Sequence, residues 1–102
     1  MPLSTALATV IQNPETPVWN YTHISTAATT VIKTGRGVLH SIVVNTTAAG
    51  AITVDDAASA TTPNIAIMKA SIAEGTYIFD CAFTVGLTIV TAAASDITVN
   101  WV

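Results

Sequence analysis

Apolar and polar residues alternate in short runs along most of this chain. From Val18 onward the runs are separated by Gly, Asn, Asp and Ala-Thr segments at intervals of roughly 8 to 12 residues, the spacing of strands in a sandwich or barrel. No stretch of ten residues shows the period of an amphipathic helix. The pattern therefore predicts an all-β antiparallel sandwich of about eight strands. The expected strands cover residues 18–24, 27–33, 38–45, 51–55, 64–70, 76–83, 87–91 and 96–101.

The first residues of the chain differ from the rest. Pro2, Pro14 and Pro17 bracket a segment with no clean period, and proline within sheets is confined to edges and strand starts. We therefore expect an extended N-terminal arm over residues 1–17 and one β-sandwich domain over residues 18–102.

Alternation with period two also predicts which side chains face the core. The expected core residues are Tyr77, Phe79, Cys81 and Phe83 in one strand, Ile52 and Val54 in another, and Ile97, Val99 and Trp101 in the last. Both sides of the strand at 38–45 are partly apolar, which is typical of a central strand. One of its sides is expected to hold Val38, His40, Ile42 and Val44.

Glycine and alanine mark the expected corners. The segment Gly35-Arg36-Gly37 adopts positive φ at little cost, so the two strands beside it should form a tight hairpin. Residues 39–54 (LHSIVVNTTAAGAITV) and 87–99 (LTIVTAAASDITV) also echo each other as strand, Thr-Ala-Ala corner and Ile-Thr-Val strand. Either the same hairpin chemistry is used twice, or two hairpins occupy related positions in two facing sheets.

Composition narrows the classes of function. Charged residues are 9% of the 102 residues, against about 25% in typical soluble proteins. The net charge is −3, and the three cations Lys33, Arg36 and Lys69 are scattered, so nucleic-acid binding is not expected. No apolar run reaches the length of a membrane helix, about 18 residues or more, and the first residues lack a basic signal region. We expect a protein made in the cytoplasm, without a membrane partner.

The sequence contains no recognisable arrangement of catalytic or metal-binding residues. His23 and His40 have no second ligand or carboxylate at a motif spacing, and Cys81 is the only cysteine. A packed or rim position is therefore expected for the histidines, with no enzyme activity, cofactor or metal. Of the acids, Asp55 and Asp56 should form a solvated turn whose side chains cap backbone amides. Asp80 and Asp96 are expected to be surface or turn acids.

The best candidates for a binding surface are aromatic. Trp19, Tyr21 and His23 alternate on one face of the first expected strand. Aromatic residues are enriched at the centres of protein interfaces, so these three are the candidate interface residues. The alternative is that Trp19 packs in this chain's own core. A surface rich in Thr, Ala, Ser and Asn costs little to desolvate, so sheet edges short of charge are expected to be covered by another subunit.

Two segments of the chain resemble a known class of proteins. They are residues 37–54, which read G-x-L-H-x-I-x-x-N-T-T-x-x-G-x-I-T-V, and residues 91–101, which read TAAASDITVNW. Over roughly residues 28–102 the chain resembles small β-rich virion structural proteins of tailed bacteriophages. The resemblance implies a jelly-roll-like fold and a head decoration, or cement, protein on the capsid surface. Such proteins commonly form homotrimers that bind the major capsid protein at junctions between hexamers. The alternative is a tail, neck or receptor-binding fibre module, in which Tyr77 or Trp101 could supply an aromatic platform for a sugar.

Overall fold

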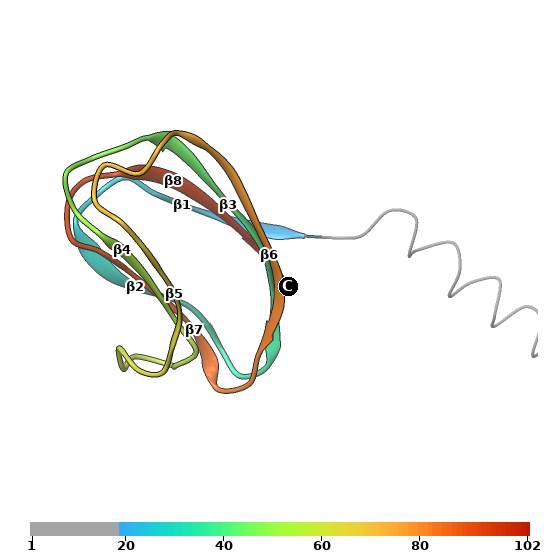
Figure 1. Ribbon diagram of the computed structural model, residues 1–102. Helices are drawn as coiled ribbons and strands as arrows, with labels where there is room; N and C mark the ends of the chain where they lie inside the picture. Colours follow the sequence, from blue (N-terminus) through green and yellow to red (C-terminus); the bar gives the residue numbers. More distant parts are fainter. Residues whose placement is uncertain (1–18) are drawn as a thin grey trace, which may run out of the picture.

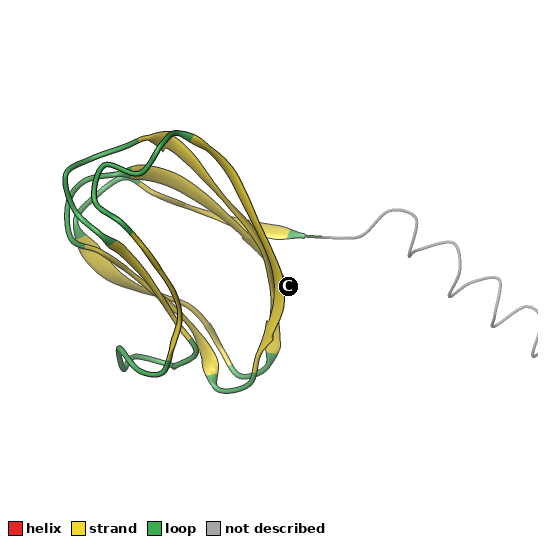
Figure 2. Cartoon of the chain, viewed as in Figure 1, coloured by secondary structure: helices red, strands yellow, loops and turns green. Residues whose placement is uncertain are grey.

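Eight β-strands and no helix make up the part of the chain that the computed structural model describes, residues 19–102 (Figure 2). The strands are β1 (Asn20–Ile24), β2 (Ala28–Thr34), β3 (Gly37–Thr46), β4 (Ile52–Asp55), β5 (Asn64–Met68), β6 (Gly75–Phe83), β7 (Gly86–Thr91) and β8 (Asp96–Trp101). Every boundary lies within two residues of its expected position. The prediction of an all-β chain with eight strands is confirmed, whereas the expected arm at 1–17 lies outside the described residues.

The strands form two antiparallel sheets of four strands each. Sheet A has the order β1-β8-β3-β6 and sheet B the order β2-β7-β4-β5. The two sheets lie one over the other as two layers (Figure 1). Among the described residues, β4 and β5 are the only consecutive strands that pair with each other, so each of the other connections passes from one sheet to the other.

The expected hairpin at Gly35-Arg36-Gly37 is wrong. Gly35 does adopt a positive φ of 97°, but this turn joins β2 in sheet B to β3 in sheet A. Both strands have their partners elsewhere: β2 pairs with β7, and β3 lies between β8 and β6. A glycine turn fixes the local change of direction, while the pairing of distant strands decides which strands are neighbours.

The two echoing segments are also not hairpins. The corner between β3 and β4 and the corner between β7 and β8 each connect the two sheets, and the flanking strands pair with one another, β3 with β8 and β4 with β7. The corners themselves touch, because the Ala92 amide donates to the Ala51 carbonyl at 3.0 Å. A Cβ added to Gly50 would lie 2.6 Å from the Cβ of Ala93. The repeated sequence thus forms two equivalent corners packed against each other.

One hydrophobic core joins the inner faces of both sheets. Its fully buried members are Leu39, Ile42, Val44, Phe83, Ile97 and Val99 from sheet A, and Ile52, Val54, Leu87 and Ile89 from sheet B. Tyr77, Phe79, Cys81 and Trp101 are half-buried against it. The inward faces expected for β4, β6 and β8 are therefore confirmed.

The expected face of β3 is only half right. Ile42 and Val44 are buried as expected, but Leu39 is buried in place of Val38 and His40. The pairing register of β3 shifts between Leu39 and Ser41 toward both neighbouring strands. A β-bulge inserts an extra residue and so reverses the alternation beyond it, an effect that period two alone cannot show.

Candidate functional site

The outer face of sheet A is the side of that sheet turned away from the core. One cross-strand row on this face contains Tyr21, Asn100, Ser41 and Ile78, and the next contains His23, Thr98, Val43 and Thr76. Tyr21 is 73% exposed and Ile78 is 61% exposed. The face therefore presents two large side chains on its edge strands, with small neutral polar groups between them.

The three candidate interface residues all reach this face. The alternation along β1 is confirmed, since Tyr21 and His23 are exposed while Ile24 is buried in the core. Trp19 is half-buried, and its ring stacks on the ring of His40 with centroids 4.5 Å apart. Trp19 is not among the residues of the core, so the alternative of a core position is wrong. The binding role of the three residues stays a prediction.

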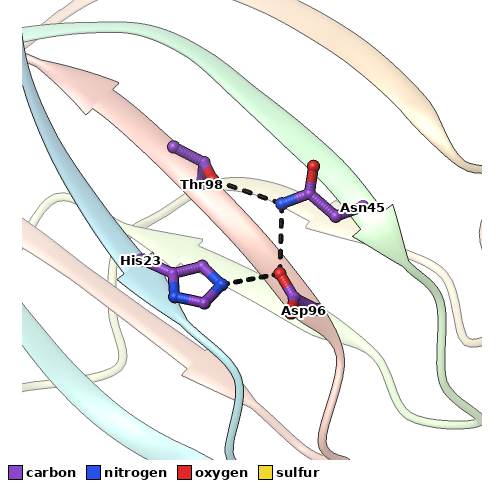
Figure 3. Close-up of polar contacts among 4 residues, drawn as sticks. All are labelled: His23, Asn45, Asp96 and Thr98. Atoms are coloured by element: carbon purple, nitrogen blue, oxygen red, sulfur yellow. Dashed lines mark hydrogen bonds and ion pairs between the residues drawn. The ribbon is translucent and has the colours of Figure 1, made fainter.

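At one end of the face a histidine and an aspartate meet (Figure 3). His23 Nε2 on β1 lies 2.7 Å from Asp96 Oδ1 on β8. The side-chain amide of Asn45, at the end of β3, donates to the same oxygen at 3.1 Å and to Thr98 Oγ1 at 3.2 Å. The hydrogen bond from His23, followed by that from Asn45, lowers the pKa of Asp96 below its ordinary value. Three neighbouring strands thus hold one exposed carboxylate in its charged form.

A second pair of the same kind lies at the other end. His40 Nδ1 is 2.5 Å from Asp80 Oδ1 on β6. Phe79 and Asp80 lie together opposite His40 in the bulge, and Asp80 adopts a positive φ of 48°. His40 is adjacent to the last residues of β8, whereas Asp96 is its first. At about 3.3 Å per residue, the two pairs are therefore roughly 16 Å apart along the strand.

Both pairs were missed by the sequence analysis, which found no carboxylate for either histidine. The partners are 73 and 40 residues apart in the chain, so no motif spacing could reveal them. Finding them requires the strand order and the register, including a bulge. The expectation that Asp80 and Asp96 are surface acids is confirmed, because their side chains are 59% and 36% exposed.

Asp55 and Asp56 behave differently from each other. The Asp56 carboxylate accepts hydrogen bonds from the backbone amides of Thr84, Val85 and Gly86 at 2.8 to 3.3 Å. These bonds, the Thr84 amide first, lower the pKa of Asp56, so its predicted capping role is confirmed. Asp55, in contrast, is fully buried, with Oδ1 accepting from Asn64 Nδ2 at 2.5 Å. Within the described residues Asp55 Oδ2 has no hydrogen-bond partner, so the expectation of a solvated turn is wrong for this residue.

The two aromatic residues considered as a sugar platform use their polar atoms within the chain. The Tyr77 hydroxyl donates to the Ala73 carbonyl at 2.6 Å, and Trp101 Nε1 donates to Thr22 Oγ1 at 3.0 Å. Over residues 19–102 there is no pocket and no group of three or more His, Cys, Asp or Glu side chains placed to hold a metal ion. The same residues include no helix with the length and apolarity to cross a membrane.

Comparison with known proteins gives no relative. No protein-family model, no curated protein and no solved structure matches this chain.

Proposed function

We propose that this chain is a structural protein of a tailed-phage virion, and specifically a head decoration, or cement, protein that binds the assembled capsid. The strand orders β1-β8-β3-β6 and β2-β7-β4-β5 support the finer proposal of a jelly-roll sandwich, in which two four-stranded sheets enclose the core. Jelly rolls recur in viral capsid proteins. The resemblance of residues 28–102 to small virion proteins supports the same assignment.

The observation that carries the proposal is the outer face of sheet A. It is four strands wide, and its two central strands carry the neutral, half-buried side chains of Val43, Thr98 and Asn100, with Ser41 buried beside them. Tyr21 stands exposed on it, and an aromatic side chain buries about 150 to 250 Å² when a partner covers it. Burying such a face strands few charges, so it suits extended contact with another protein.

The mechanism is linkage between binding and assembly. A protein that binds the assembled shell, and not its separate subunits, stabilises the shell by mass action. A homotrimer would bind several coat subunits at once, which raises the effective concentration of each further contact. We propose that residues 1–17 extend this attachment to a neighbouring capsomer.

Titration of purified protein onto heads that lack it tests the proposal. The expected result is saturation at hundreds of copies per head, by a species of three times the 10.5 kDa chain mass, with a rise in the temperature at which heads open. Tyr21→Ala should weaken this binding by about tenfold, because Tyr21 is an exposed aromatic side chain of this face and aromatic residues are enriched among binding hot spots. Val31→Thr is the matched control, since Val31 is an exposed residue of sheet B and not of this face.

Three outcomes would contradict parts of the proposal. No binding to heads, with tens of copies in the tail or fibres instead, would favour the tail, neck or receptor-binding module. A monomer in solution and on heads would reject the trimer. A chain that lacks residues 1–17 is expected to fold but not to saturate heads, and full binding by it would remove the role of the arm.

A further inference from the structure

Among residues 19–102, the outer face of sheet A contains acidic side chains but no lysine or arginine. Asp80 and Asp96 are its acids, and His23 and His40 are their partners. The three cations of the chain lie elsewhere. Lys33 is in β2 with its Nζ 6.0 Å from the ring centroid of Trp101, Arg36 is in the turn between β2 and β3, and Lys69 follows β5. Within the described part of the chain, this face therefore has two acidic side chains and no Lys or Arg.

The two acids lie at opposite ends of a neutral stretch of this face. The row between them holds Tyr21 and Ile78 on the two edge strands, with Asn100 and Ser41 between. Interfaces commonly combine aromatic anchors with charged groups at the rim. A second copy of this chain would bring acids of the same sign to the contact, whereas a partner with Lys or Arg at the rim would complement them.

We infer that the outer face of sheet A docks a basic protein segment, whose Lys or Arg side chains pair with Asp80 and Asp96. This inference is argued from the side chains of the face. It rests on the proposed function in one respect only, that the basic segment belongs to a coat subunit.

Each carboxylate is held in place by the chain itself. His23 Nε2 lies 2.7 Å from Asp96 Oδ1, and His40 Nδ1 lies 2.5 Å from Asp80 Oδ1. The side chains of Asp96 and Asp80 are nevertheless 36% and 59% exposed, so a partner can reach them. The lowered pKa of Asp96 favours its charged form.

The test is a nuclear magnetic resonance titration of the full chain with a hexa-arginine peptide at low salt, with hexa-glutamate as the control peptide. At pH 7.5 the shifts should centre on the amides around Asp80 and Asp96. Asp80→Asn and Asp96→Asn should each weaken binding by up to about fivefold, the range of an exposed ion pair. Asparagine tolerates the positive φ of residue 80, so this variant keeps the fold. Glu74→Gln, which removes an acid between β5 and β6, should have less effect than either change.

Shifts spread evenly over all acids, or equal binding by the two aspartate variants and the natural chain, would overturn the inference. If the chain binds the peptide at this face but does not bind heads, the capsid role is rejected and the inference stands. If the chain binds heads but not the peptide, the inference is rejected and the capsid role stands.

Discussion

Neighbouring residues of the same type occupy opposite environments in this protein. Asp55, the last residue of β4, is fully buried, while the carboxylate of Asp56 accepts hydrogen bonds from the backbone amides of residues 84–86. Both acids were expected in one solvated turn, because the sequence pattern does not show which carboxylate accepts hydrogen bonds from the segment between β6 and β7. At this scale the sequence predicted the capping chemistry of Asp56 but not its partners.

Asp56→Asn should lower the melting temperature at pH 7, because asparagine keeps an acceptor but loses the charge that the amides favour. The pKa of Asp56 is lower in the folded than in the unfolded chain, where it is about 3.9. The stabilisation is therefore present above about pH 4 and is lost as the pH falls through the folded value. Thermal unfolding followed by circular dichroism should show the natural chain and the variant converging toward pH 2. An equal difference at pH 7 and pH 2 would contradict this account.

The sequence pattern predicted the positions of the strands in the chain, but it did not predict which strands pair with each other. Periodicity is a local property, and it located β8 without error. The position of β8 between β1 and β3, and the bulge at His40, depend on contacts between residues far apart in the chain. The same reason explains why both His–Asp pairs were missed although the face of Tyr21 and His23 was predicted.

The bulge in β3 can be tested by a pair of truncations. Strict alternation places Val38 inside, whereas the structure buries Leu39 completely and leaves Val38 half-buried. Leu39→Ala should lower the free energy of unfolding by about 2 to 5 kcal/mol, the range for a buried leucine. Val38→Ala should lower it by less than half as much. Urea denaturation of both variants measures the difference, and a larger loss for Val38→Ala would place the bulge elsewhere.

The contact between the two echoing corners predicts coupled substitutions. In Gly50→Ala the new Cβ would lie 2.5 Å from the amide nitrogen and 2.6 Å from the Cβ of Ala93. Overpacking of this kind costs about 1 to 3 kcal/mol of stability. Ala93→Gly should recover part of that loss, because it removes one of three close contacts, the third being the carbonyl carbon of Ala92 at 2.9 Å. A double-mutant cycle measures the coupling, with the exposed Ala49→Gly as the second partner that should show none.

The molecule as a whole has two broad faces of different character. The outer face of sheet A contains two His–Asp pairs, while sheet B exposes the uncharged side chains of Val31 and Ile67. Composition predicted a chain short of charge, but the placement of both His–Asp pairs on one face depends on the strand order.

The central place of β8 in sheet A decides when the chain can fold. A product that stops at Ser95 would leave β1 and β3 without the strand that joins them, and we expect it to be unfolded and readily cleaved by proteases. Circular dichroism and limited proteolysis would show this, and a β spectrum for that product would contradict it. During translation, sheet A therefore cannot close until β8 has left the ribosome. Until then its exposed strand edges could pair with those of other nascent chains, so expression should depend strongly on temperature and on the supply of chaperones.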